Sequence, residues 1–304
     1  MAAGQAFPKK IESSEGVLIL DDSIEEKPYT DENDIICRHF DHSKDRLVKG
    51  INLISCLYQN GGYSLPVNFR LVEKTEKYID KKTGKEKRRS PVTKNELARE
   101  MIQQVVKNQA QFAFILFDVW FASKENLNFI KHDQKREFIC PLKFNRYVAL
   151  SREDKRAGRW QKVDTLLIEE NDVRGIYLEG SEFPVLLTKQ VFTNEDGSTG
   201  VLYLISSDMT VSSDRIKTIY QRRWNVEVYH KSSKQNVSLS KSPTQTETTQ
   251  TNHFFAALCG YKKLEMLKVE TRTNHFALRT KLYVNALQSA FKTLREMNPV
   301  QFSA

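Results

Sequence analysis

Two short apolar runs, each followed by an acid, constrain the fold of this chain more than any other feature. Residues 16–20 (GVLIL) precede Asp21 and Asp22, and residues 111–117 (QFAFILF) precede Asp118. Uninterrupted apolar runs of this length are typical of strands buried on both faces. An acid at the end of a buried strand is costly unless it is paired or binds a cation. The two runs therefore predict a buried sheet with an acidic site at its strand ends.

The surrounding segments predict an α/β arrangement around one mixed sheet. Residues 47–58 and 65–74 are two further strands, separated by the turn Asn60-Gly61-Gly62, and residues 138–147 are a fifth. From Thr93, apolar residues recur at helical spacing, which predicts a helix before the strand that ends at Asp118. The polar stretch 23–46 is interpreted as a long loop.

Later segments differ in character. Short strand-like runs at 166–168, 175–178, 185–192 and 201–205 predict an inserted β subdomain. Helices are expected at about 213–235, 248–268 and 276–297. The predicted organisation is a disordered segment at 1–15, the first part of the core at 16–149, the β insertion at 150–212, and a helical part at 213–304.

Composition narrows the classes of function. The chain has 304 residues and a net charge of +9, from 47 Lys and Arg against 38 Asp and Glu, which suits nucleic acid as a partner but also occurs in ordinary proteins. No apolar run exceeds six residues and residues 1–10 hold no apolar segment like that of a signal peptide, so we expect a cytoplasmic globular protein without membrane contact. The four cysteines lie far apart without a C-x-x-C pair, which favours reduced structural thiols.

The helix expected from residue 213 carries an unusual stripe. Tyr220, Arg223, Glu227, Lys231 and Lys234 follow one another at steps of three or four, so they share one helical face. One interpretation is a solvated face with ion pairs between residues four positions apart. The other is an active-site face, with an acid among cations.

The acids support the second interpretation. Asp22, Asp118 and Glu227 come from two strand ends and one helix, and three carboxylates form a hard oxygen site suited to Mg²⁺ or Mn²⁺. Two such ions can activate an attacking oxygen and stabilise the leaving oxygen in phosphoryl transfer. The cations of the stripe would then hold phosphates beside the metal ions.

The stripe also carries a resemblance to a known family. The segment from Tyr220 to Lys234 matches the pattern Y-(2)-R-(3)-E-(6)-K. This resembles the YREK signature of bacterial insertion-sequence DDE transposases. Residues 18–23 (LILDDS), 40–43 (FDHS) with Lys49-Gly50, and 116–123 (LFDVWFAS) are similar to the same group, so the resemblance runs from about residue 16 to 268.

The resemblance implies an RNase H-like (retroviral-integrase-like) core with a β insertion between the second Asp and the Glu. It implies Mg²⁺-dependent nicking of transposon ends, hairpin formation and strand transfer into target DNA. The partners would be double-stranded DNA and a second copy of the chain, which would form a homodimer in the DNA complex. The protein would lie in the bacterial cytoplasm and would associate with the nucleoid when it binds DNA. Carried over by position, the metal ligands would be Asp22, Asp118 and Glu227. The residues that contact phosphates at the transposon end would be Tyr220, Arg223 and Lys234.

Several assignments depend on weaker arguments. Asp22 is preferred to Asp21 because the family's Asp is followed directly by a hydroxyl residue, here Ser23. Strand alternation allows only one of the two to face the site. Lys231 and His230 lie beside the stripe, and His230 either touches DNA or only covers the helix face. Trp224 either stacks on an extruded base or packs in the core.

The N-terminus departs from the family pattern. Only 21 residues precede Asp22, too few for the helical DNA-binding domain that the resemblance implies. We therefore expect a copy without that domain. The alternative function is a catalytically silent DNA-binding or dimerising remnant that inhibits full-length transposase. The basic segment 81–90 is either a solvated loop tip or a DNA contact.

Overall fold

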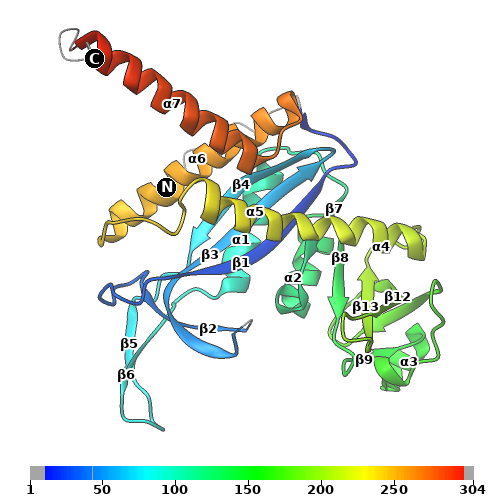
Figure 1. Ribbon diagram of the computed structural model, residues 1–304. Helices are drawn as coiled ribbons and strands as arrows, with labels where there is room; N and C mark the ends of the chain where they lie inside the picture. The colour runs from blue at the N-terminus through cyan, green and yellow to red at the C-terminus, as the bar shows by residue number, and fades with distance from the viewer. Residues whose placement is uncertain (1–10, 43, 298–304) are drawn as a thin grey trace. The chain divides into compact units, whose positions relative to one another are not determined.

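The computed structural model describes residues 11–42 and 44–297. The chain forms two compact units, of which the first ends at Glu227 and the second begins at Val228. Figure 1 shows the mixed sheet of the first unit and the long helices of the second.

One large sheet organises the first unit. In spatial order its strands are β10 (Gln161–Lys162), β9 (Tyr147–Ala149), β11 (Val173–Leu178), β12 (Pro184–Thr193), β13 (Thr199–Ser206), β8 (Glu137–Leu142), β7 (Phe114–Phe117), β1 (Val17–Glu26), β3 (Arg46–Asn60) and β2 (Cys37–Asp41). The strand β4 (Tyr63–Leu71) also pairs with β3, and β5 (Glu76–Ile79) with β6 (Glu86–Arg89) forms a separate hairpin.

The centre of the sheet combines both strand directions. β1 pairs antiparallel with β3 and parallel with β7, and β7 pairs parallel with β8. The helix α1 (Lys94–Lys107) crosses between β4 and β7, and a capping box between Thr93 and Glu96 fixes its first turn. This confirms the predicted α/β class with a mixed sheet.

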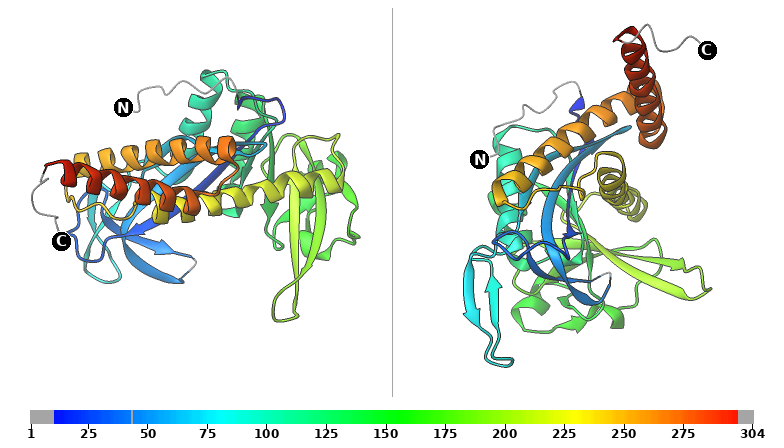
Figure 2. Two further views of the ribbon diagram at one scale, coloured as in Figure 1. Left: turned by 45° about the horizontal axis from the view of Figure 1, so that its top comes forward. Right: turned by 60° about the vertical axis from the view of Figure 1, so that its left-hand side comes forward.

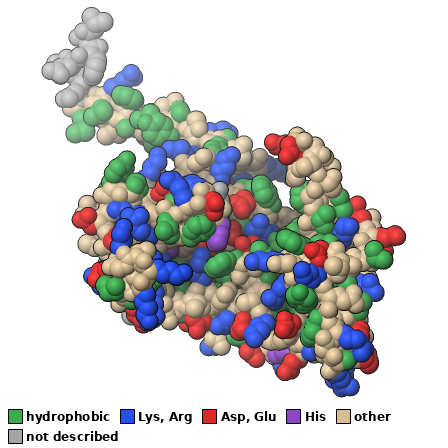
Figure 3. All heavy atoms as spheres, turned by 90° about the horizontal axis from the view of Figure 1, so that it is seen from below, with side chains coloured by type: hydrophobic (Ala, Val, Ile, Leu, Met, Phe, Trp, Pro, Cys, Tyr) green, Lys and Arg blue, Asp and Glu red, His purple; other side chains and the backbone are tan. Residues whose placement is uncertain are grey.

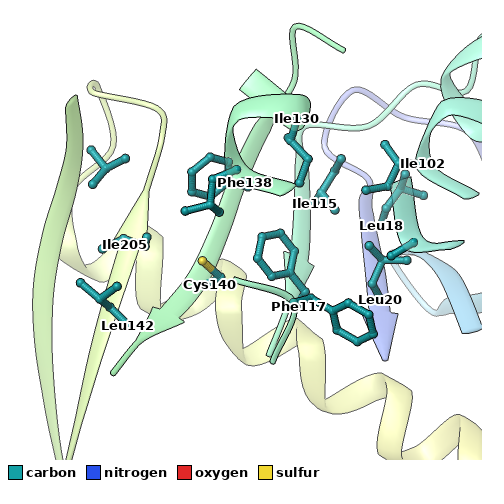
Figure 4. Close-up of a cluster of buried hydrophobic side chains, with 14 of the residues drawn as sticks. Leu18, Leu20, Ile102, Ile115, Phe117, Ile130, Phe138, Cys140, Leu142 and Ile205 are labelled. Carbon is teal, nitrogen blue, oxygen red and sulfur yellow. The ribbon is translucent and has the colours of Figure 1, made fainter. Parts of the chain in front are cut away.

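A continuous apolar cluster lies between α1 and one face of the sheet. Leu18 and Leu20 of β1, Ile115 and Phe117 of β7, and Ile102 of α1 all belong to it (Figure 4). Because side chains alternate along a strand, Ile19 and Leu116 point to the opposite face of the sheet. This assignment of faces determines where the acids lie.

The predicted β insertion is part of the main sheet. β13 pairs antiparallel with β8, so the hairpin of β12 and β13, followed by β11, β9 and β10, extends the core sheet instead of forming a sheet of its own. Figure 2 shows this hairpin projecting from the sheet, like the hairpin of β5 and β6. Residues 166–168, predicted as a strand, form none, and the short helix α3 (Arg152–Arg156) was not predicted.

The N-terminal third contains more structure than predicted. β1 extends to Glu26 and β2 occupies 37–41, so the stretch 23–46 is only partly a loop. Residues 1–10 of the predicted disordered segment lie outside the described residues, but residues 11–15 are held in place. Asn60 donates to the carbonyl of Ile11 at 2.9 Å, and the N–H of Ser13 donates to the hydroxyl of Tyr58 at 2.9 Å.

The predicted helix 213–235 is interrupted. α4 (Ser213–Gln221) is followed by a 3₁₀ turn, η5 (Arg222–Trp224), and then by α5 (Asn225–Asn236). Arg222 fixes this turn, because its guanidinium donates to the carbonyls of Glu15 at 2.8 Å and Gln59 at 2.7 Å. The sequence pattern placed the stripe on one straight helix, and the structure divides it between two.

The second unit is helical. It contains most of α5, then α6 (Glu247–Thr271) and α7 (His275–Met297). The ring of Tyr261 lies 5.0 Å from that of Tyr229 and 5.1 Å from that of His275, which joins the three helices. Within residues 11–42 and 44–297, no helix has both the length and the apolar character needed to cross a membrane.

Candidate active site

Asp118 follows the buried strand β7 and begins the 3₁₀ turn η2 (Val119–Phe121). Its carboxylate accepts hydrogen bonds from the N–H groups of Trp120 at 3.0 Å and Phe121 at 3.3 Å. Burial raises the pKa of Asp118, and the nearby charge of Asp21 raises it further, against the opposing effect of Phe121 and Arg223. The local environment therefore disfavours the ionised form of this acid.

Asp21 lies beside Asp118. In the parallel pair of β1 and β7, Leu20 is opposite Phe117, so the next residues along both strands are Asp21 and Asp118. Neighbouring strands are about 5 Å apart, which brings the two acids next to each other. Asp21 points away from the face that α1 covers, because Leu20 belongs to the cluster under α1.

Asp22 points to the face that α1 covers. Its carboxylate accepts hydrogen bonds from the amide of Asn52 at 2.7 Å and from the ammonium of Lys94, the first residue of α1, at 2.9 Å. These partners satisfy the carboxylate with an amide and a cation. The structure thus separates the two neighbouring acids and places Asp21, not Asp22, on the side of Arg223.

Arg223 connects these acids to the helix. Its guanidinium lies 3.9 Å from the carboxylate of Asp21, and its carbon Cζ is 5.9 Å from the centre of the Tyr220 ring. Burial disfavours the charged guanidinium, but Tyr220, Asp21, Asp118 and Glu227 together raise the pKa of Arg223. One cation is therefore within electrostatic reach of three carboxylates from β1, β7 and α5.

Glu227 lies in the first turn of α5 and is exposed to solvent. The start of α5 is attached to the sheet side of the same unit, since the hydroxyl of Ser64 donates to the side-chain oxygen of Asn225 at 3.4 Å. Arg223 and Glu227 are four residues apart, and the turn η5 places them at the junction of α4 and α5. Burial raises the pKa of Tyr220 above its ordinary range, so its hydroxyl stays neutral.

The donor set fits divalent cations. Asp21, Asp118 and Glu227 offer only carboxylate oxygens, which are the ligands of Mg²⁺ and Mn²⁺. Burial is the main cause of the raised pKa of Asp118, and the opposing charge of Arg223 does not cancel it. Among residues 11–42 and 44–297, however, no three His, Cys, Asp or Glu side chains are already close enough to hold a metal ion.

Comparisons with protein families identify the kind of domain. The model of a DDE superfamily endonuclease matches residues 3–163, and the model of a transposase DDE domain matches residues 88–261. The chain belongs to the DDE superfamily of transposases. Comparison with curated proteins gives no match to the chain. The mixed sheet, the acids at its strand ends and the C-terminal helices are consistent with the RNase H-like fold.

A DDE transposase domain is a nuclease of the transposase type that acts on DNA. The structure places the remaining predicted DNA contacts of this transposase in different environments. Trp224 is 68% exposed and Lys231 is exposed, whereas His230 is only 6% exposed and its ring is not on the surface. Lys234 is half-buried on α5 in the second unit. Figure 3 shows lysines and arginines interspersed with acids on one face, not a uniformly basic surface.

The sequence did not predict the two partners of Asp22. Asn52 of β3 and Lys94 of α1 hold Asp22, and neither lies in a recognisable motif. The buried His39 lies 3.3 Å from the thiol of Cys37, and burial lowers its pKa to about 3. His39 thus lies in the strand β2, and the prediction of a polar loop around it was wrong.

Proposed function

We propose that this transposase domain cleaves and rejoins DNA strands at the ends of a mobile element with Asp21, Asp118 and Glu227 as the ligands of divalent cations. The observation that carries the proposal is the parallel register of β1 and β7, with Asp21 and Asp118 side by side. The reach of Arg223 to both acids and to Glu227 supports it. Asp22, preferred by the sequence pattern, is instead a positioning residue for β1 and α1.

Mg²⁺ or Mn²⁺, when bound, would polarise the scissile phosphate and lower the pKa of the attacking water or hydroxyl. The chain's own residues supply the rest. The η2 N–H groups orient Asp118, the turn η5 presents Glu227, and Arg223 contributes a positive charge beside the carboxylates. A guanidinium at this position can also bind a DNA phosphate through charge-assisted hydrogen bonds.

The finer steps follow from the same assignment. We infer Mg²⁺-dependent nicking, hairpin formation and strand transfer on double-stranded DNA, with Tyr220, Arg223 and Lys234 near the phosphates of the transposon end. Trp224 and Lys231 are exposed, which supports DNA contacts, whereas the burial of His230 favours a structural role. We also propose a homodimer in the DNA complex.

The experiment is a cleavage assay on a supercoiled plasmid and on linear transposon ends, with Mg²⁺ or Mn²⁺. The variants Asp21→Asn, Asp118→Asn and Glu227→Gln should each lose at least about 10³-fold in rate, because members of one catalytic unit fail together. Asp22→Asn is the matched control, one residue away with the same charge change. It should retain most of the activity and lose stability instead.

Two outcomes would contradict the proposal. Normal cleavage by Asp21→Asn together with loss in Asp22→Asn would restore the assignment from the sequence pattern. An absence of cleavage by the unaltered chain, combined with DNA binding and inhibition of an active transposase, would establish the silent remnant. Metal-dependent protection of the chain from thermal unfolding, lost in Asp118→Asn, separates metal binding from cleavage.

A further inference from the structure

A pocket is lined in part by Val119 and Trp120 of η2, the turn that follows Asp118. It has a volume of about 280 Å³, and the residues that matter for its chemistry are Asn95, Trp120, Ser123, Lys143 and Arg146. Asp118 itself begins η2, so the pocket and the acidic site share this turn.

Two cations of the pocket have no acidic partner. Within the part of the chain that the structure describes, neither Lys143 nor Arg146 is in an ion pair with a carboxylate. Many other cations of the first unit are paired, such as Lys94 with Asp22 and Lys131 with Glu137. Two uncompensated cations at one pocket favour an anionic ligand.

The turn that carries these cations is held firmly. The N–H of Arg146 donates to the carbonyl of Lys143 at 3.0 Å, and Val163 donates to the carbonyl of Arg146 at 2.9 Å. The N–H of Asp164 also donates to the carbonyl of Phe144 at 3.0 Å. The backbone of the turn is therefore fixed before any ligand binds, which lowers the entropic cost of binding.

Aromatic rings accompany the cations. Trp120 lines the pocket and is 46% exposed, and Phe144, at the tip of the turn, is 62% exposed. Trp120 also has two neighbours from other parts of the chain: the ammonium of Lys94 lies 5.1 Å from its ring centre, and the ring of His42 lies 5.3 Å away. Cations with exposed aromatic rings are the combination that binds single-stranded nucleic acid, through phosphates and base stacking.

We propose that this pocket binds an unpaired DNA strand beside the scissile phosphate, with Lys143 and Arg146 on its phosphates and Trp120 against a base. This proposal rests on the proposed function for its DNA partner. A volume of about 280 Å³ is near the lower end of small-ligand pockets, roughly 300–1,000 Å³, and suits one nucleotide rather than a duplex.

The test measures binding of a fluorescent single-stranded oligonucleotide and of a duplex in EDTA, with every variant built on Glu227→Gln so that no cleavage interferes. Lys143→Ala with Arg146→Ala should weaken single-strand binding. It should also reduce the slope of log K against log salt by about 1.4, since each single-strand phosphate contact contributes about 0.7. Trp120→Ala should weaken binding by about 5- to 150-fold.

The matched control is Lys107→Ala with Arg174→Ala, which removes the same charge from exposed positions outside the pocket. It should leave the salt slope nearly unchanged. Equal losses in the control, or equal losses for single strand and duplex in the pocket variant, would overturn the proposal. Binding in EDTA does not require catalysis, so a chain that fails to cleave could still bind the single strand through this pocket.

Discussion

At the scale of single residues, Asp118 gives a prediction about pH. Burial and the charge of Asp21 raise its pKa in the folded chain, so the folded state binds this proton more tightly than the unfolded state. The stability that Asp118 contributes is therefore fully present below the ordinary Asp pKa of about 4 and is lost as the pH rises through the folded value.

Asp118→Asn should consequently be more stable than the unaltered chain at pH 7 in metal-free buffer. An Asn side chain can still accept from the N–H groups of Trp120 and Phe121, so the cap of η2 is kept. Urea unfolding midpoints measured from pH 4 to pH 8 check this. The advantage of the variant should shrink toward pH 4, and an advantage that grew toward acid would contradict the assigned cause.

The residue scale also shows what the sequence could not decide. The pattern limited the choice of first acid to Asp21 or Asp22, because alternation puts them on opposite faces. The choice between them depends on which face α1 covers and on the pairing of Leu20 with Phe117. Both are contacts between residues distant in sequence, and neither follows from local periodicity. The identity of the metal ligands remains a prediction.

At the scale of elements, the turn η5 is the feature most closely tied to the proposed chemistry. The side chain of Arg222 reaches the carbonyls of Glu15 and Gln59 and the side-chain oxygen of Gln59, and so fixes the junction before Glu227. Arg222→Ala should lower the free energy of unfolding by roughly 1.5–3 kcal/mol, the range for hydrogen bonds to a charged group. The variant should also cleave DNA more slowly than the loss of folded protein alone would explain.

Two comparisons make this prediction specific. Arg222→Lys should not restore activity, because one ammonium cannot reproduce the fork that contacts several acceptors. Gln221→Ala, the exposed neighbour on α4, is the control and should change neither property strongly. Urea denaturation and the plasmid cleavage assay give both values. Full cleavage by Arg222→Ala would mean that η5 is not required to position Glu227.

The sequence predicted most elements but not their connections. β3, β4, α1, β7 and the C-terminal helices follow from apolar periodicity and turn residues. The extension of the core sheet by β13 does not, because its pairing with β8 joins segments about 65 residues apart. The 3₁₀ turn was missed because it differs from an α-helix only in hydrogen-bond spacing, and its cause, Arg222, acts through contacts to β3 and the N-terminal segment.

At the scale of the whole molecule, the proposed homodimer has a specific surface to consider. α7 exposes an apolar stripe formed by Tyr283, Leu287, Phe291 and Leu294, at steps of four, four and three. Such a stripe occupies one face of a helix, and contiguous exposed apolar surface commonly marks an interface. The second unit thus offers an exposed apolar helix face, and we propose that a second copy covers it.

Leu287→Lys with Phe291→Lys should therefore convert a dimer to monomer, because two charges would be buried in the interface. Asn285→Lys with Ser289→Lys adds the same charge to the opposite side of α7 and should leave the dimer intact. Sedimentation velocity with and without duplex DNA measures the outcome. If both double variants dissociated to the same extent, the added charge itself, and not its place on the apolar stripe, would be the cause. A chain that stayed monomeric on DNA while cleaving it would place the complete reaction, metal ligands included, within one protomer.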